Sequence, residues 1–270
     1  MTPNTGFLID HMSRAARAAG ALTLDAFRDF RRMEIGHKGP ADFVTDSDRA
    51  SEQLIREHLR PLGADWSFRG EEFAPYSGSD PHHEWLVDPI DGTTNFINGL
   101  DYTISIALRR DGETVCGVLY NPVADEMFTV ERGSGAFANG KRLTVSDRVD
   151  PRLFNIGTGL PTSGLFTHGG FYSRLDRIRD QIGAIRIIGS SANSCAHVAD
   201  GRLTGYFEES GLLDWAVGVL LVTEAGGIVT DWWSRDRHFY EKTGTVIAAN
   251  PATHAFLIEQ LADAPRKDPA

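Results

Sequence analysis

Two aspartates three residues apart, followed by a glycine and two hydroxyl residues, form the strongest chemical signal in the sequence. They are Asp88 and Asp91, within residues 85–96, and they come directly after an apolar run. Gly92 lets another group approach the backbone closely, and Thr93-Thr94-Asn95 has the composition of a first helical turn, whose N–H groups can bind an anion. Carboxylates would repel that anion unless a cation lay between them. Because Mg²⁺ prefers oxygen ligands and often keeps a phosphate in its shell, the stretch predicts a magnesium–phosphate site.

The same stretch has a purely structural interpretation. Pro89 lacks a backbone donor and has a fixed φ, so we expect the strand to end there. A strand end with an Asx turn and a helix cap would then explain one aspartate. It would not explain a second one, and the spacing alone leaves both interpretations open.

Two more acids stand where the expected elements could bring them to this site. Glu71 follows the strand-like residues 66–69, and its neighbour Glu72 is expected to point to the opposite face. Asp214 opens an apolar helix expected over residues 212–225, where its charge meets the positive end of the helix dipole. The alternative for Asp214 is a helix-capping acid with no further role.

Apolar residues at steps of three and four predict two helices in the N-terminal part, over residues 5–31 and 48–60. The first stripe consists of Leu8, Met12, Ala15, Ala19, Leu22 and Ala26, and the second of Ala50, Leu54, Ile55, His58 and Leu59. Strands are expected over 85–87, 103–109, 113–120 and 126–131, with a hairpin turn at Asn139-Gly140.

Strands and helices alternate after about residue 149. Helices are expected near 171–181, 191–199, 212–225 and 252–262, and strands at 185–188, 204–207 and 245–248. This alternation predicts a sheet covered by helices. We therefore divide the chain into an N-terminal α+β half, residues 1–148, and a C-terminal α/β half, residues 149–270.

The composition is that of a globular chain with an acidic surplus. The 270 residues include 27 Lys and Arg against 37 Asp and Glu, a net charge of −10, which disfavours nucleic acid and anionic membranes as partners. No apolar run approaches the ~18 residues of a membrane span, and Asp10, Arg14 and Arg17 interrupt any signal-peptide core. Cys116 and Cys195 are the only cysteines, so we expect no disulfide framework and a cytoplasmic protein.

Three other patterns carry no function. Residues 135–141 match a phosphate-binding loop except that Arg142 follows, and the next residues are strand-like. No serine stands in a Gly-x-Ser-x-Gly sequence. His82-His83 has no nearby cysteine or histidine that would complete a zinc site.

Residues 85–96 resemble the signature of the inositol monophosphatase family of metal-dependent, lithium-sensitive phosphatases. Further segments resemble family elements in the same order, so that the resemblance covers about residues 8–262: 42–48, 70–72, 189–192, 213–216 and 222–227. The resemblance implies an α/β fold, namely the αβαβα sandwich of the inositol monophosphatase and fructose-1,6-bisphosphatase type. It also implies a homodimer.

The resemblance implies the roles of individual residues. The N-terminal half would carry most metal ligands, and the C-terminal half the last ligand and the substrate loop. The implied Mg²⁺ ligands are Glu71, Asp88, Asp91, Asp214 and the carbonyl of Ile90, and the implied catalytic residues are Glu71, Thr93 and Asp48. The implied substrate-binding residues are Asp91, Gly92, Thr93, Thr94, Gly189, Ser190, Ser191 and Glu208.

The implied reaction is hydrolysis of a phosphate monoester by a metal-activated water, without a covalent intermediate. One ion at Glu71 would lower the pKa of water, and a second at the three aspartates would stabilise the leaving alkoxide. Thr93, bonded to Asp48, would orient the water, and the amides of residues 92–94 would hold the phosphate oxygens.

The substrate is less closely indicated than the reaction. Leu213 stands where the family usually has tryptophan, and the spacing from Glu208 to Asp214 is one residue shorter than in the animal enzymes. Glu208 is preferred over Glu209 as the residue that binds substrate hydroxyls because it follows Tyr206-Phe207. We expect myo-inositol 1-phosphate or a similar polyol phosphate.

Other activities are alternatives. Histidinol-phosphate phosphatase is the first, and Thr94, where that branch often has lysine, counts against it. A fructose-bisphosphate or nucleotide-bisphosphate phosphatase would need a cluster of basic residues to bind the second phosphate, and residues 157–210 do not show one. A non-enzymatic role as an RNA-polymerase-associated regulatory factor is a further alternative from a different class.

Overall fold

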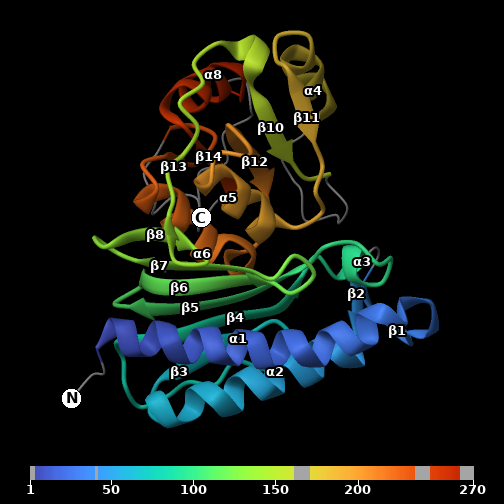
Figure 1. Cartoon of the computed structure of the whole chain (residues 1–270), viewed down its shortest axis with the longest axis vertical. Coiled ribbons are helices and arrows are strands. Elements are labelled where there is room, and N and C mark those ends of the chain that lie inside the picture. The colour runs from blue at the N-terminus through green and yellow to red at the C-terminus, as the bar shows by residue number, and fades with distance from the viewer. Residues whose placement is uncertain (1–3, 40–41, 161–170, 235–243, 262–270) are drawn as a thin grey trace.

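The computed structural model describes residues 4–39, 42–160, 171–234 and 244–261. Its elements form five layers (Figure 1): two helices, a seven-stranded sheet, two helices, a five-stranded sheet, and two more helices. Three apolar cores lie between the layers. One lies between the first helix pair and the first sheet, one surrounds the central helices between the two sheets, and one lies between the second sheet and the last helix pair. The expected αβαβα sandwich is therefore confirmed.

The outer layer of the N-terminal half consists of α1 (Thr5–Arg28) and α2 (Asp46–Leu59). The apolar stripe expected in α1 is mostly buried, but Leu22 is 36% exposed and Thr23 is buried in its place. The Thr23 hydroxyl lies 2.6 Å from the hydroxyl of Tyr102, so a satisfied polar group can replace an apolar one here.

The buried face of α2 also differs from the expected stripe. Ala50 and His58 are exposed, whereas Asp48, Ser51 and Glu52 are buried. Apolar periodicity does not predict such a face, because its buried residues are polar. The buried acids are stabilised by hydrogen bonds to neighbouring backbone and hydroxyl groups.

The first sheet has the strand order β3-β4-β5-β6-β7-β8-β9. Only β3 and β4 run parallel, and each later strand pairs antiparallel with its neighbour. Its strands are β3 (Ser67–Gly70), β4 (His83–Asp91), β5 (Thr103–Arg110), β6 (Glu113–Asn121), β7 (Glu126–Glu131), β8 (Gly135–Ala138) and β9 (Lys141–Arg142). The expected turn at Asn139-Gly140 joins the last two strands, with φ of 45° and 77°.

The expectation that β4 ends at Pro89 is wrong. The strand continues to Asp91, but its register to β5 shifts between Asp88 and Asp91, so that two residues of β4 face one residue of β5. A bulge of this kind tolerates proline because the extra residue leaves the hydrogen-bond ladder.

The second sheet has the order β11-β10-β12-β14-β13 and mixes parallel and antiparallel pairs. Its strands are β10 (Asn155–Thr158), β11 (Ala184–Arg186), β12 (Gly205–Glu209), β13 (Ile228–Thr230) and β14 (Thr245–Ala249). Four strands were not expected from the sequence: β10, β13, and the two strands of a small sheet, β1 (Ile35–Gly39) and β2 (Asp42–Thr45). All four are short, three to five residues, and lack a clear alternating pattern.

Helices cover both faces of the second sheet. The inner pair is α5 (Ser191–Ala199) and α6 (Leu212–Glu224), and the outer pair is α4 (Phe171–Arg179) and α8 (Pro251–Leu261). Short helical turns complete the described elements: η1 (Phe30–Arg32), η2 (Arg60–Leu62), α3 (Thr93–Phe96) and η3 (Pro151–Leu153). No described helix is long and apolar enough to cross a membrane.

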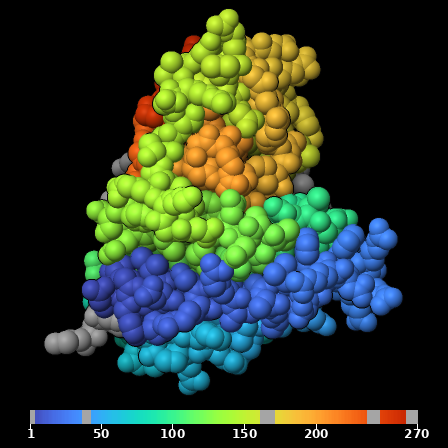
Figure 2. Space-filling view, in the orientation of Figure 1, coloured from blue at the N-terminus to red at the C-terminus, as the bar shows by residue number. Residues whose placement is uncertain are grey.

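The two halves of the chain share one core. The central apolar cluster combines Leu86 and Phe128 of the first sheet with Cys195 of α5 and Trp215 of α6. Figure 2 shows the same stacking at the surface, with the N-terminal helices at one end and the C-terminal elements at the other. The proposed boundary at residues 148/149 separates the strands of the two sheets but does not separate two independent cores.

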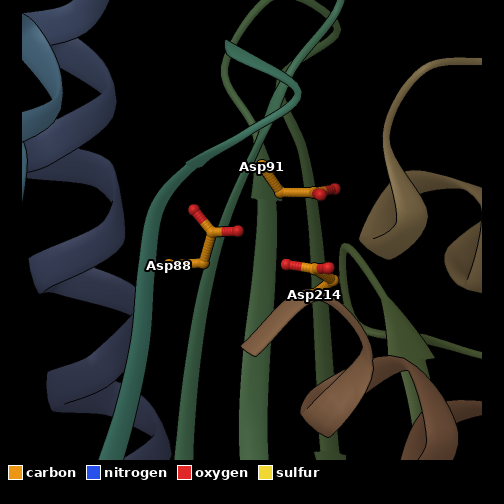
Figure 3. Close-up of side chains that lie close together, drawn as sticks. All are labelled: Asp88, Asp91 and Asp214. Carbon is orange, nitrogen blue, oxygen red and sulfur yellow. The ribbon is translucent and has the colours of Figure 1, made fainter. Parts of the chain in front are cut away.

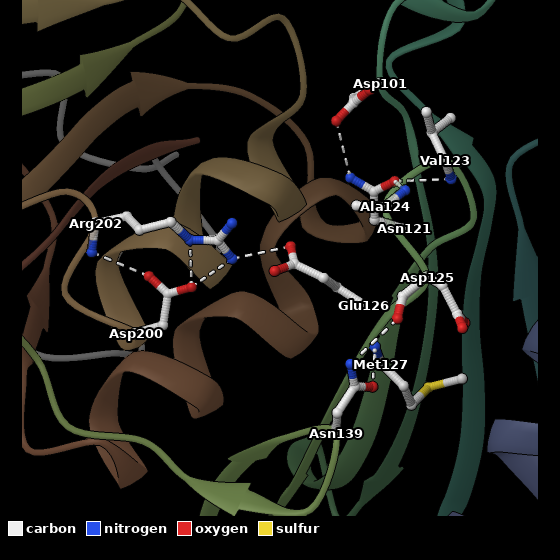
Figure 4. A network of polar contacts seen from close by, with 10 residues as sticks. All are labelled: Asp101, Asn121, Val123, Ala124, Asp125, Glu126, Met127, Asn139, Asp200 and Arg202. Carbon is white, nitrogen blue, oxygen red and sulfur yellow. Dashed lines mark hydrogen bonds and ion pairs between the residues drawn. The ribbon is translucent and has the colours of Figure 1, made fainter.

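A polar network also joins the halves (Figure 4). Arg202, in the turn after α5, pairs with Asp200 and with Glu126 of β7, the latter at 2.9 Å. Asn121 accepts the amides of Val123 and Ala124, and so shapes the turn that leads into β7. The network therefore fixes a first-sheet turn against the turn that connects α5 to the second sheet.

A tight contact between Gly117 of the first sheet and Val217 of α6 allows the shared core to be tested by mutation. A Cβ on Gly117 of β6 would lie 2.8 Å and 2.9 Å from the two γ-methyl groups of Val217. We expect Gly117→Ala to lower the free energy of unfolding by about 1–3 kcal/mol through overpacking. In a Val217→Ala background the same change should cost much less. Urea denaturation of the four proteins measures this, and an equal cost in both backgrounds would contradict the packing described.

Candidate metal and phosphate site

Three carboxylates from distant parts of the chain meet at the carboxyl end of β4. Asp88 and Asp91 lie on β4 and Asp214 in the first turn of α6, and Figure 3 shows their side chains pointing toward one another. One oxygen of each lies within 4.8 Å of the others, and Asp88 and Asp91 are 2% and 6% exposed. Three converging carboxylate oxygens are a ligand set for a hard divalent cation.

The bulge in β4 explains how residues three apart can both face the site. In a regular strand Asp88 and Asp91 would lie on opposite faces, but the extra residue between them reverses the alternation. The Asp88 carboxylate also accepts the amide of Ile90 at 3.0 Å. The Asx turn of the structural interpretation is thus present, and it occurs together with the acidic cluster rather than instead of it.

Asp91 connects the signature to the loop at residues 189–192. Its carboxylate accepts the amides of Ser191 at 3.3 Å and Ala192 at 2.8 Å, and the hydroxyl of Ser190. These groups form the start of α5, where N–H donors and the helix dipole favour a negative charge. The Asp91 side chain is therefore held rigidly while it faces Asp88 and Asp214.

Asp214 caps helix α6 and is also one of the three clustered carboxylates. Its Oδ2 accepts the amide of Gly211 at 2.9 Å, so it caps α6 as the structural alternative supposed. Leu213 packs against the central apolar core, so this departure from the family pattern leaves Asp214 in the cluster.

Glu71 lies beside the three aspartates but outside their tight cluster. Glu71 comes directly after the last residue of β3, so it lies in a turn and not in the strand. Its side chain forms a hydrogen bond with Asp88. Glu71 is the acid that faces Asp88, as expected, but the turn and not strand alternation distinguishes it from Glu72.

The two other sequence-predicted catalytic residues also meet here. Thr93 Oγ1 donates to Asp48 Oδ1 at 3.3 Å and lies 3.3 Å from the carbonyl oxygen of Ile90. Asp48 is fully buried, and its other oxygen accepts the amide and hydroxyl of Thr45, at 2.8 Å and 2.6 Å. A buried acid thus orients the threonine hydroxyl beside the cluster of aspartates.

Two glycines allow the signature and the loop at residues 189–192 to touch. Gly92 and Gly189 have φ of 96° and 79°, and a Cβ on Gly92 would lie 2.8 Å from the carbonyl oxygen of Gly189. Asn95 donates from Nδ2 to the carbonyls of Ile188 and Asp101, both at 2.8 Å. This bridging contact of Asn95 was not expected from the sequence, where the only hint was that Asn95 lies within the signature. Thr94 is exposed at the start of α3.

A second carboxylate group borders the cluster on the side of β12. Ser191 donates its hydroxyl to Glu208 Oε2 at 2.6 Å and accepts the hydroxyl of Tyr206 at 2.9 Å. A Cβ on Gly159 would collide with Glu208 Oε1, so only glycine at that position leaves room for this carboxylate. Glu208, rather than Glu209, therefore faces the site.

The site is electrostatically strained without a cation. Burial, and then repulsion from Glu71, Asp91 and Asp214, raises the pKa of Asp88 well above its ordinary value. Burial raises the pKa of Asp91, with Asp214 adding to the effect, and it raises the pKa of Asp214 to about 6 and that of Glu208 to about 8. The charged neighbours that act on Asp88 are all carboxylates. A bound divalent cation would remove this repulsion.

Comparison with known proteins agrees with this geometry. The sequence matches the inositol monophosphatase family over residues 7–266. It is 38% identical to an inositol-1-monophosphatase of Mesorhizobium japonicum, with 93% of this chain and 95% of that protein covered. It is also 38% identical to the Nus factor SuhB of Escherichia coli, with 93% and 94% covered. The crystal structure of the extragenic suppressor protein suhB of Bartonella henselae superposes with a TM-score of 0.90 at 37% identity, covering 95% and 98%.

The layered fold and the buried acidic cluster define a phosphatase of the metal-dependent type. The chain belongs to the inositol monophosphatase family, and it is accordingly an enzyme that hydrolyses phosphate monoesters.

The raised pKa values predict how pH changes the stability of the metal-free protein. An aspartate in the unfolded chain has a pKa of about 4, whereas the pKa of Asp214 in the folded protein is raised to about 6. Between these values the folded state binds more protons, so stability from this group falls as pH rises. Replacing Asp214 with Asn, which can still cap Gly211, should therefore stabilise the chelated protein by about 1–3 kcal/mol more at pH 8 than at pH 4.

Urea denaturation of wild type and Asp214→Asn at both pH values measures this difference. His197 and His254, whose pKa values burial lowers, affect both proteins and cancel in the comparison. Added Mg²⁺ should stabilise the wild type more at pH 8. A gap between the proteins that shrinks from pH 4 to pH 8 would contradict the electrostatic description.

Proposed function

We propose that this chain is a Mg²⁺-dependent phosphomonoesterase that hydrolyses a small polyol phosphate, with myo-inositol 1-phosphate as the favoured substrate. The observation that carries the metal dependence is the convergence of three carboxylates, two buried and one half-buried, whose negative charges repel one another. The donors that meet there among the described residues are carboxylate oxygens, and Mg²⁺ is a common divalent cation that such a set suits. This substrate is favoured by two relatives named inositol-1-monophosphatase, which are 38% and 41% identical to this chain.

The ligands that we propose for Mg²⁺ are the carboxylates of Asp88, Asp91, Asp214 and Glu71 and the carbonyl of Ile90. When bound, the metal supplies the positive charge that activates water and stabilises a leaving oxygen, with no covalent intermediate. Asp88 and Asp91 provide oxygens from one strand and Asp214 from the facing helix, while Glu71, the more exposed acid, closes the side toward solvent.

The proton and the phosphate would be handled by the chain itself. Asp48 accepts the hydroxyl of Thr93, so the lone pairs of that oxygen can orient a water and assist its deprotonation. The backbone of residues 92–94 and the substrate loop at Gly189 and Ser190 come together through the close contact of Gly92 with Gly189. We propose that their polar groups hold the phosphate oxygens.

Phosphate release from myo-inositol 1-phosphate tests the metal role. Chelated wild type should be inactive, regain activity with Mg²⁺, and lose it again with millimolar Li⁺. Asp88→Asn should lower kcat/KM by at least about 10²-fold, the scale expected for a damaged metal site, with an equal or higher Tm because one of several repelling charges is removed. Asp147→Asn, an exposed acid distant in sequence from the cluster, serves as the matched control. Full turnover by protein shown to be metal-free would refute the proposal.

The substrate preference depends on Glu208. Its Oε2 is occupied by the hydroxyl of Ser191, and its Oε1 lies over Gly159 beside the cluster. Burial holds a proton on this carboxyl up to about pH 8, so it can donate to as well as accept from a substrate hydroxyl. We propose that it binds a ring hydroxyl of a polyol phosphate.

Glu208→Gln separates substrate binding from the reaction. It should weaken hydrolysis of myo-inositol 1-phosphate by about 1–3 kcal/mol, the scale of one hydrogen bond to an ionisable group. An aryl phosphate has no ring hydroxyl, so its hydrolysis should change little. Histidinol phosphate would pair its ammonium group with the Glu208 carboxylate. For this substrate the substitution should weaken hydrolysis more, and the effect should depend on salt concentration. Glu209→Gln is the matched control. An equal fall on every substrate would place Glu208 in the reaction or the fold instead.

A second function has one supporting observation. A relative that is 38% identical over 93% of this chain is named Nus factor SuhB, which keeps the role of an RNA-polymerase-associated regulatory factor open. The phosphatase and binding roles do not exclude each other, because the complete acidic cluster argues only against vestigial chemistry. Recovery of RNA polymerase from a cell extract by wild type and Asp88→Asn alike would identify a binding role independent of the metal site.

The homodimer and the cytoplasmic location stay proposals. The homodimer is proposed from the resemblance to the inositol monophosphatase family. Both cysteines are free and buried, which is compatible with a reducing compartment.

A further inference from the structure

Helix α2 carries a buried carboxylate that the proposed reaction does not use. Glu52 is 0% exposed, whereas Glu57 on the same helix is exposed. The partners of Glu52 are backbone amides: Oε2 accepts from Glu72 at 2.7 Å, Oε1 accepts from Phe73 at 3.3 Å, and the amide of Glu71 also contributes. One side chain thus holds three consecutive amides of the turn that carries Glu71.

The residue before this turn shows how tightly it is held. A Cβ on Gly70 would lie 2.1 Å from Glu52 Oε1, a distance that no side chain could accept. Gly70 also pairs with Val87 of β4, so the turn begins from a fixed strand end. The backbone around Glu71 therefore has the sheet on one side and the Glu52 carboxylate on the other.

The same face of α2 contacts the other segments of the site. Asp48, one helical turn before Glu52, accepts the hydroxyl of Thr93, and Ser51 donates to the carbonyl of Pro89 in the β4 bulge at 3.2 Å. Three neighbouring buried side chains of one helix thus reach the turn of Glu71, the bulge between Asp88 and Asp91, and the threonine.

We propose that Glu52 is a positioning residue, which fixes the backbone of residues 71–73 and thereby sets the place of the Glu71 carboxylate beside Asp88. The proposal rests on the proposed metal-dependent function, because the position of Glu71 matters for metal binding. A carboxylate is suited to this task since its two oxygens can accept several N–H groups, whereas a glutamine turns an N–H₂ group toward them. Groups that orient a metal ligand commonly change metal affinity when replaced.

Binding of Mn²⁺, followed by electron paramagnetic resonance without substrate, tests the proposal on the full chain. Glu52→Gln should weaken Mn²⁺ binding by about 10–100-fold and raise the Mg²⁺ concentration for half-maximal activity, while kcat at saturating Mg²⁺ stays near that of the wild type. Hydrogen exchange at the amides of Glu72 and Phe73 should become faster. Glu57→Gln is the matched control on the same helix and should match the wild type in every measurement.

Gly70→Ala gives an independent variant, should Glu52→Gln fail to fold. It keeps the charge of Glu52 but displaces its carboxylate, so we expect the same weakening of Mn²⁺ binding and the same faster exchange. Wild-type Mn²⁺ affinity in the folded variants, even with a lower Tm, would overturn the proposal and leave Glu52 a merely structural residue. A wild type that binds neither Mn²⁺ nor Mg²⁺ would instead overturn the proposed function, and this inference with it.

Discussion

Mutual repulsion between buried carboxylates is the constraint on which the rest of this structure depends. Asp88, Asp91 and Asp214 bring their oxygens within 4.8 Å of one another although burial and repulsion work against their ionised forms. Such an arrangement persists only when the surrounding structure fixes each side chain independently. The hydrogen bonds of the site do this: each aspartate accepts at least one backbone amide from its own or a facing segment.

The layered fold supplies the segments that hold these acids. Helix α2 lies on the outer face of the first sheet, while α5 and α6 lie on its inner face and present their first turns to the end of β4. The bulge in β4 lies between them. Because the central core is shared by the two chain halves, a displacement of α6 against the sheet would also displace Asp214 from Asp88 and Asp91. Packing and chemistry are therefore coupled through one core.

Most of the element pattern could be predicted from the sequence. Strongly apolar helices such as Leu212–Glu224 and strands with clear turns such as Glu126–Glu131 were located to within one residue, since elements buried in a core are rich in apolar residues and end at turn residues. The short strands and the buried face of α2 could not be predicted this way. Asp48, Ser51 and Glu52 look like surface residues until their partners are known, and those partners lie in segments up to 45 residues away.

The sequence by itself determined the ligand chemistry: which acids are present, their spacing within the signature, and the glycines that permit close backbone contacts, because residue type and local backbone freedom are properties of the chain. Only the tertiary structure decided which acids meet. The bulge turned Asp88 and Asp91 to the same side, the packing of α6 brought Asp214 to them, and Glu52 held the turn of Glu71. These are contacts between segments far apart in sequence, and their geometry comes from the packing of layers, which no local pattern records.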